Sequence, residues 1–204
     1  RKVNEDDIGK TLKALQVSRI PNPLAMNMYS LGYDSGGNLT QLSPTVKENL
    51  KTYLSQFRLV TDAVNIKDAY IINIAVDFAI LTKVGFNKND VLLRCVSAVQ
   101  DFFDIKNWQI GQPIVLSDII YELSLVDGVS SVVPPEENNP ERLPIIVTNK
   151  YKPSDGYSGN VFDIKSATIN GVIYTALDPS IFEIKYINSD IKGKVVGDNI
   201  GPGE

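Results

Sequence analysis

The chain has 204 residues, a net charge of −4, 43% hydrophobic residues and 22% charged residues, which are typical of a globular fold with one large domain or two small ones. Histidine is absent and Cys95 is the single cysteine, which excludes His-dependent nucleophilic catalysis, His-ligated zinc and an internal disulfide. The basic residues are scattered, so nucleic acid is not an expected partner. The longest apolar run is interrupted by Asn73 and Asp77, so membrane insertion is not expected either.

Residues 1–23 are a polar lead-in from a preceding domain, with a short helix expected over residues 6–16. The chain starts without methionine and ends on Gly-Pro-Gly-Glu, which suggests a fragment of a longer protein. Residues 24–34 alternate between apolar and polar side chains, which predicts a strand. The pair Gly36-Gly37 predicts a tight turn after it, because glycine accepts the positive φ values that such turns need.

The first predicted helix covers residues 43–57. Ser43 is suited to cap the free amides at its start, and Pro44 suits the first helical position. Apolar side chains recur on one face at helical spacing, which indicates a stripe that faces the protein core. The residues of this stripe are Val46, Leu50, Tyr53, Leu54 and Phe57.

The strongest predicted strand covers residues 69–82 and is expected at the centre of its sheet. Its even-numbered face, residues 72–80, is apolar and should be fully buried, whereas the other face should be only partly covered. Asp77 on that second face is expected to be solvated or paired. A second helix follows over 87–104, with Asn87 or Asn89 as cap and Cys95 as a buried apolar residue.

A third helix is predicted to start with Ser117 as its cap and to stop at Gly128, followed by a strand over 129–133. Residues 134–144 are rich in proline and asparagine, which predicts a linker. Short apolar segments then follow over 145–196, and the pair Asn170-Gly171 predicts a hairpin.

These elements predict an α+β fold with a mixed β-sheet covered by about three helices and followed by a smaller β-rich module. The predicted domains are the lead-in 1–23, an α+β core over 24–133, the linker 134–144, and a β-rich carboxy-terminal association module over 145–204. Within the core, the helices 44–57 and 88–103 are both expected on one face of the sheet.

The order strand, helix, strand, helix, helix, strand over residues 24–133 resembles the baseplate J-like family of contractile tails. The strings that carry the resemblance are MNMYSLGYD, YIINIAVDFAI, VLLRCVSAVQDFF and LSDIIYELSLVDGVSSV. Residues 170–196, NGVIYTALDPSIFEIKYINSDIKGKVV, resemble the carboxy-terminal end of the wedge subunits of T-even-type phage baseplates. The likeness covers roughly residues 24–196, and the linker 134–144 is longer than the family pattern has it.

The resemblance implies a structural protein of the virion, in the tail baseplate, that is assembled in the host cytoplasm. Subunits of this kind join neighbouring wedges into a ring, form homodimers and bind other baseplate wedge proteins. The family brings no catalytic, cofactor-binding or metal-binding residues, so none is assigned and no enzymatic activity is expected.

Two alternatives remain open. A tail-associated cell-wall hydrolase requires two carboxylates about 5–10 Å apart; the candidate carboxylates are those of Asp77, Asp101, Asp104, Asp118 and Asp127. A tail-associated carbohydrate-binding module requires a row of exposed aromatic side chains in the β-rich segment. Its candidates are Tyr151, Tyr157, Phe162, Tyr174, Phe182 and Tyr186.

The β-rich segment 145–196 is also the expected association surface. Its strands are short, and a small sheet of this kind needs packing on something larger. Tyr174, Phe182 and Tyr186 are the candidate interface residues, because apolar side chains are many for so small a segment. If all of them pack on the chain's own core instead, the segment is not an interface.

Overall fold

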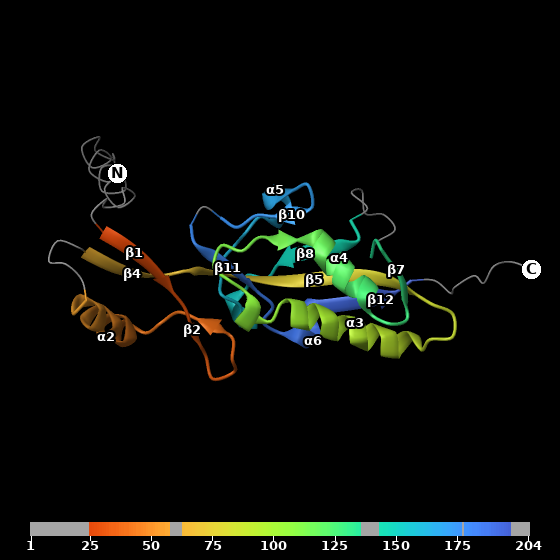
Figure 1. Cartoon of the computed structure of the whole chain (residues 1–204), viewed down its shortest axis with the longest axis horizontal. Coiled ribbons are helices and arrows are strands. Elements are labelled where there is room, and N and C mark those ends of the chain that lie inside the picture. The colour runs from red at the N-terminus through yellow and green to blue at the C-terminus, as the bar shows by residue number, and fades with distance from the viewer. Residues whose placement is uncertain (1–24, 58–62, 136–142, 177, 197–204) are drawn as a thin grey trace, which may run out of the picture. The chain divides into compact units, whose positions relative to one another are not determined.

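The computed structural model describes residues 25–57, 63–135, 143–176 and 178–196 (Figure 1). Helices and strands each account for about a third, so the predicted α+β class is confirmed. The chain divides into two compact units, one holding the described residues of 25–32 and 41–68, the other those of 33–40 and 69–196. The predicted lead-in 1–23, its helix over 6–16, and residues 136–142 of the predicted linker lie outside the described residues.

The first unit is a strand–helix–strand arrangement. In chain order its elements are β1 (Ala25–Ser30), α2 (Pro44–Ser55) and β4 (Ala63–Asp68). The two strands pair in parallel, from Ala25 opposite Ala63 to Ser30 opposite Asp68. The predicted helix start is confirmed, because the Ser43 hydroxyl accepts a hydrogen bond from the amide of Val46.

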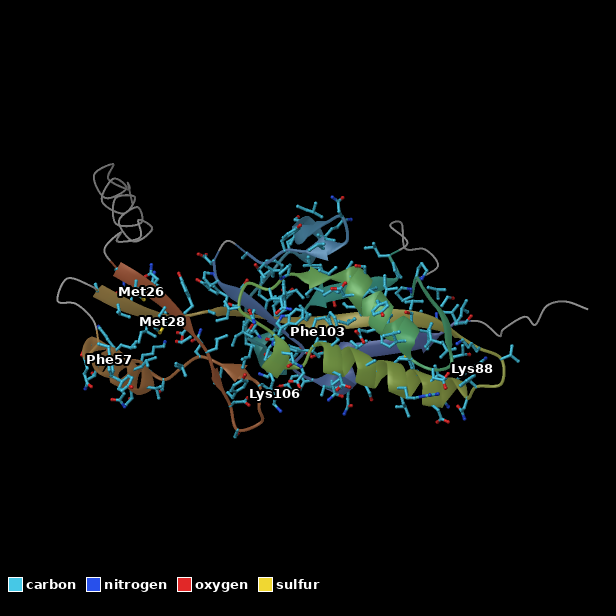
Figure 2. All side chains as sticks on the ribbon, viewed as in Figure 1. Met26, Met28, Phe57, Lys88, Phe103 and Lys106 are labelled. Atoms are coloured by element: carbon cyan, nitrogen blue, oxygen red, sulfur yellow. The ribbon has the colours of Figure 1, made fainter. Side chains whose placement is uncertain are left out.

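The apolar stripe of α2 does not form a core, which corrects the prediction. No residue of α2 is buried, and Tyr53 is 58% exposed. Phe57, just beyond the helix, is 72% exposed, and its ring contacts that of Tyr53, with centroids 5.1 Å apart. Met26 on β1 is also exposed (Figure 2). The physical reason is that the two strands among the described residues of this unit offer too little surface to bury one face of a helix.

The second unit is organised around β5 (Tyr70–Thr82), which confirms the predicted central strand. Four short strands complete its sheet, and each of them pairs with β5. These are β7 (Val129–Val133), β8 (Ile145–Asn149), β11 (Ser180–Glu183) and β12 (Ile191–Val195). β7 and β8 run antiparallel to β5, whereas β11 and β12 run parallel to it.

Two of the predicted domain boundaries are therefore wrong. The segment 145–204 is not a separate module, because β8, β11 and β12 belong to the same sheet as β5. The segment 24–133 is not one core either, because β1, α2 and β4 form the first unit and α2 is not part of the second. Both errors have one cause, namely that apolar alternation identifies a strand but not the strand with which it pairs.

Two helices pack on this sheet and on each other (Figure 1). α3 (Lys88–Phe102) begins as predicted, since the Asn87 side chain accepts from the amides of Asn89 and Asp90. α4 (Leu116–Leu125) begins two residues earlier than predicted, with Val115 at the cap position and no side-chain cap hydrogen bond. Ser117 is therefore inside the helix rather than its cap. The residues that α3 and α4 bury are Val91, Cys95, Val99, Leu116, Ile119 and Leu123.

The even-numbered face of β5 is fully buried from Ile72 to Ile80, as predicted, and the other face is largely but not fully covered, since Leu81 is half-buried. Val76 and Phe78 on the predicted buried face are 0% exposed, but Ile71 and Ala79 on the other face are also buried. Asp77 is half-buried. Cys95 is fully buried, which confirms it as an apolar residue of the core, and this burial raises the pKa of its thiol to about 11.

A second, small sheet carries the predicted hairpin. Asn170 and Gly171 have φ values of 52° and 78°, as a two-residue turn of this type requires. The strands of this sheet are β6 (Ile114–Val115), β9 (Thr168–Ile169) and β10 (Val172–Ile173). The second unit also contains β3 (Leu39–Thr40), α5 (Ile164–Ala167) and α6 (Ile187–Asp190).

Candidate functional site

The three predicted interface residues lie in different environments. Tyr174, just after β10, is 50% exposed, and Tyr186, just before α6, is 41% exposed. Phe182 on β11 is only 1% exposed and packs edge-on against Phe162, with centroids 5.7 Å apart. Phe182 is therefore a core residue and not part of an interface, which corrects the prediction. All four residues of β11 are buried, so alternation along this short strand carries no information about an exposed face.

Tyr186 is held in place by a buried carboxylate. Asp190 is 0% exposed, and its side chain accepts hydrogen bonds from the Tyr157 hydroxyl at 2.6 Å and from the Tyr186 amide at 2.9 Å. The hydroxyl of Ser189 donates to the same carboxylate at 3.2 Å. The rings of Tyr157 and Tyr186 meet edge to face with centroids 5.5 Å apart. A buried charge with several donors is the arrangement that avoids an uncompensated desolvation cost.

The same contacts fix the loop before Tyr157. Gly156 has a φ of +85°, and a Cβ atom built on it would lie 2.3 Å from the Tyr186 hydroxyl oxygen, so only glycine fits there. The ammonium group of Lys185 donates to the carbonyl of Gly156. Burial, followed by the hydrogen bond to Asp190, raises the pKa of Tyr157 to about 12. Tyr157 is thus a neutral hydrogen-bond donor at physiological pH.

Asparagine and serine side chains attach the rest of this loop to β5. Asn73 is 1% exposed, and its side-chain oxygen accepts from the amide of Ser158 at 2.8 Å. The carbonyl of Ile71 accepts from the Ser158 hydroxyl at 2.7 Å and from the Asn160 side-chain amide at 2.8 Å. The loop that carries Tyr157 is therefore bound to the sheet by hydrogen bonds whose partners are fixed, which gives the surface around Tyr186 a defined shape.

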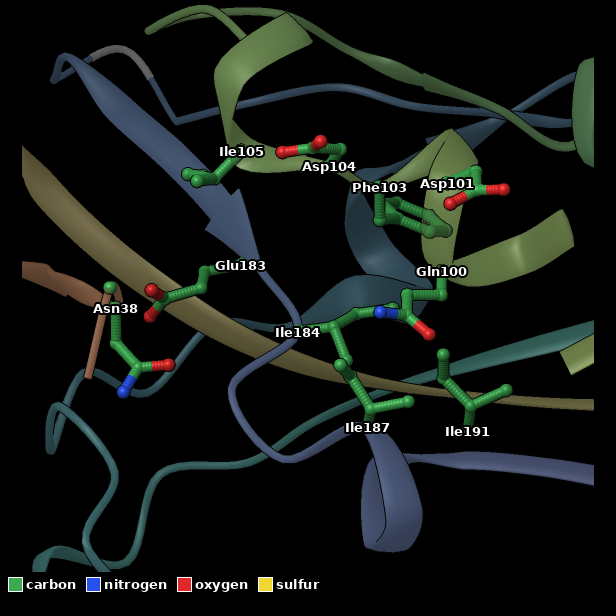
Figure 3. A pocket seen from close by; sticks show the side chains of 11 residues that line it. Asn38, Gln100, Asp101, Phe103, Asp104, Ile105, Glu183, Ile184, Ile187 and Ile191 are labelled. Carbon is green, nitrogen blue, oxygen red and sulfur yellow. The ribbon is translucent and has the colours of Figure 1, made fainter. Parts of the chain in front are cut away.

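The structure brings two of the five candidate carboxylates to one pocket. Asp101 and Asp104 line a pocket of about 210 Å³ together with Glu183, whereas Asp77, Asp118 and Asp127 do not line it. In Figure 3, Glu183 and Asn38 lie at one end of the pocket and Asp101 and Gln100 at the other. The apolar part of its lining is formed by Phe103, Ile105, Ile184, Ile187 and Ile191.

Glu183 is the most buried carboxyl group of this pocket, and it is 4% exposed. One of its oxygens accepts from the amide of Leu39, and the other accepts from the side-chain amide of Asn73 at 2.7 Å. Burial raises the pKa of Glu183, and the two hydrogen bonds oppose that rise. A raised pKa suits a general acid, but both oxygens already serve to connect β3 with β5 and β11.

The other carboxylates have local structural roles. The Asp104 side chain accepts from the amide of Lys106 at 3.0 Å and so caps the short helical turn after α3. Asp127 lies 3.9 Å from Arg94 in an exposed ion pair. Among the residues that the structure describes, no group of three or more His, Cys, Asp or Glu side chains is arranged to hold a metal ion.

The sequence patterns named Tyr157 as an aromatic candidate and Asn73 as a polar residue in an apolar run, but they missed the contacts through which these residues and Asp190 shape this region. Tyr157, Asp190 and Asn73 are far apart in the chain, and each resembles an ordinary loop or strand residue when it is considered alone. Gly156, directly before Tyr157, was the one local signal, because a glycine in a polar loop marks a backbone position with special requirements. Of the predicted aromatic row, Tyr151 is exposed like Tyr174 and Tyr186, while Phe182 belongs to the core.

No protein-family model matches the chain, and no curated protein matches it. The resemblance to the baseplate J-like family therefore stays a prediction. No helix within the described ranges is both long enough and apolar enough to cross a membrane.

Proposed function

We propose that the chain is a structural subunit of a phage tail baseplate wedge, which joins wedges into a ring through protein–protein contacts. The observation that carries this proposal is the first unit, in which α2 has no buried residue and the apolar side chains of Val46, Tyr53 and Phe57 are exposed. Exposed apolar stripes of this kind mark surfaces that are covered in an assembly. The resemblance described above supplies the kind of assembly.

The second unit supports the same proposal with a different surface. Tyr174 and Tyr186 are half exposed; the backbone amide of Tyr186 donates to the buried Asp190, and its ring packs against Tyr157. Tyrosines that are fixed before binding lose little conformational entropy when a partner covers them, and tyrosine is enriched at protein interfaces. A homodimer is the expected smallest assembly, because two-fold dimers are the commonest closed arrangement. Other wedge proteins are the further expected partners.

Sedimentation velocity over a range of concentrations tests the proposal. The wild-type chain should form a dimer, and the double variant Tyr174→Lys/Tyr186→Lys should sediment closer to the monomer, because lysine is depleted from interface cores. The circular dichroism signal of the helices should not change. Tyr151→Lys is the matched control, since Tyr151 is exposed to a similar extent. A wild-type chain that stays monomeric at high concentration contradicts the proposal.

A cell-wall hydrolase is the second candidate, and one observation favours it: Asp101, Asp104 and the buried Glu183 line one pocket. Incubation of the chain with purified peptidoglycan, followed by detection of released fragments, distinguishes the two functions. A structural subunit releases nothing above a heat-denatured control. Release by the wild type that Glu183→Gln abolishes would support the hydrolase instead.

A further inference from the structure

The pocket at the end of α3 combines an apolar lining with carboxyl groups. All of its lining residues belong to the second unit. Figure 3 shows the isoleucines around α6 along one side of the pocket and the residues at the end of α3 along the other. Gly37, Asp101 and Ile187 are exposed, so the pocket is open to solvent. The apolar side chains that line it are those of Phe103, Ile105, Ile184, Ile187 and Ile191.

The carboxyl groups of this pocket have no cationic partner within the described ranges. No lysine or arginine of those ranges forms an ion pair with Asp101, Asp104 or Glu183, and none lines the pocket. Lys185 acts on Glu183 from farther away, but its ammonium group donates to the carbonyl of Gly156. The pocket therefore carries negative charge that the described side chains do not neutralise.

The end of α3 adds to this negative character. α3 ends at Phe102, and its last turn contains Asp101 but no basic residue. The carboxyl end of a helix carries a partial negative charge, so it is stabilised by a cation and destabilised by a carboxylate. Asp104 follows Asp101 by three residues, which is less than one helical turn along the chain. A cation that binds here therefore compensates the helix end and both aspartates together.

We propose that this pocket binds an arginine side chain of a partner protein. The aliphatic stem of the arginine packs along the isoleucines and Phe103, and its guanidinium group lies against the carboxylates of Asp101 and Asp104. The pocket has a volume of about 210 Å³, below the roughly 300–1,000 Å³ of pockets that hold drug-sized ligands, which suits a single side chain. Arginine is expected rather than lysine, because arginine is enriched at interfaces, lysine is depleted there, and the planar guanidinium can bond two carboxylates.

This proposal goes beyond the proposed function and does not rest on it. An arginine-binding pocket serves any assembly to which the chain belongs, and Tyr174 and Tyr186, whose substitution tests the dimer, do not line it. A monomeric wild-type chain would contradict the dimer and leave arginine binding unaffected. A pocket that binds no arginine would leave the dimer unaffected.

Nuclear magnetic resonance titration of the 204-residue chain tests the proposal. The probe is an acetylated and amidated tripeptide of alanine, arginine and alanine. We expect saturable shifts of the backbone amides at 100–105 and 183–191, and a lower affinity at high salt, because salt screens the charges. The control peptide carries citrulline in place of arginine, which keeps the shape of the side chain without its charge. It should bind at least tenfold more weakly.

Two variants locate the binding to the pocket. Asp101→Asn combined with Asp104→Asn removes both charges and should lower the affinity at least tenfold, while asparagine at 104 can still cap the turn at Lys106. If this double variant fails to fold, Ile187→Lys tests the same pocket, because it places a competing cation at an exposed position of the lining. Asp118→Asn is the matched control and should bind like the wild type, since Asp118 is exposed and does not line the pocket.

Four results overturn the proposal. The first is an absence of saturable shifts at millimolar peptide, and the second is equal binding of the citrulline peptide, which would mean that charge plays no part. The third is tighter binding of agmatine, which carries the same guanidinium group without a peptide backbone and would indicate a small-molecule site. The fourth is a shift of the same amides with protein concentration alone, in which case a second copy of the chain occupies the pocket.

Discussion

Removal of the Tyr157 hydroxyl should destabilise the second unit by about 1.5–2 kcal/mol. Tyr157→Phe keeps the ring against Tyr186 and deletes only the donor that lies 2.6 Å from the fully buried Asp190 carboxylate. A hydrogen bond to a charged group contributes about 1.5–3 kcal/mol. The lower part of that range applies, because the Tyr186 amide and the Ser189 hydroxyl still donate to Asp190.

Urea denaturation at neutral pH measures this effect. The fluorescence of Trp108, the single tryptophan of the chain, reports on the same unit. With a slope of about 1–3 kcal/mol per molar urea, the midpoint should fall by roughly 0.5–2 M. Tyr151→Phe is the matched control and should change the stability by less than about 0.5 kcal/mol, because Tyr151 is exposed.

A double-mutant cycle with Asp190→Asn separates the hydrogen bond from other effects of each substitution. The two changes should couple by about 1 kcal/mol or more, because the residues are in direct contact. A loss below about 0.5 kcal/mol for Tyr157→Phe, or the absence of coupling, would refute the reasoning that the hydroxyl compensates the burial of Asp190.

Three further substitutions test the core and its electrostatics. Val76→Asp places an unpaired charge at a fully buried position of β5 and should lower the free energy of unfolding by several kcal/mol or leave the chain insoluble. An unchanged melting temperature would mean that Val76 is not part of the core. Gly193→Ala puts a methyl group 2.5 Å from Leu92 and 2.7 Å from Phe78. It should lower the free energy of unfolding, measured by urea denaturation, by about 1–3 kcal/mol. Lys194→Ala is the control and should leave the stability unchanged, because Lys194 is exposed. Because burial raises the pKa of Glu183, the stability that this group contributes is present below the ordinary value of 4.5 and is lost as the pH rises through the raised value. The free energy of unfolding is therefore measured for Glu183→Gln and for the wild type at increasing pH from pH 4. The value for Glu183→Gln should rise relative to that of the wild type as the pH increases. A difference between the two that does not change with pH would contradict the raised pKa.

Local chemistry made several elements predictable. The caps Ser43 and Asn87, the Asn170-Gly171 turn and the strand around Val76 follow from preferences that act over a few residues, and the structure has all of them. Elements of this kind need no knowledge of their neighbours. Their agreement with the structure shows that the local sequence and the fold are consistent.

Pairing over long distances was not predictable in this way. Strand β11 lies about a hundred residues after β5, and nothing in its four residues specifies whether its partner is β5 or another chain. For the same reason Phe182 resembled a surface residue, although it is buried and packs against Phe162. The pair Tyr157 and Asp190 was missed because a hydrogen bond between two loop residues leaves no periodic pattern.

The position of β5 has a consequence for synthesis of the chain. All four strands that pair with it come later in the sequence, and the last, β12, ends at Val195, about 110 residues after β5. At about 5–20 residues per second, translation leaves this apolar thirteen-residue strand without its full set of partners for on the order of 10 s. The nascent chain therefore needs protection from aggregation during that interval, and a ribosome that stalls before β11 releases a product with an open apolar strand.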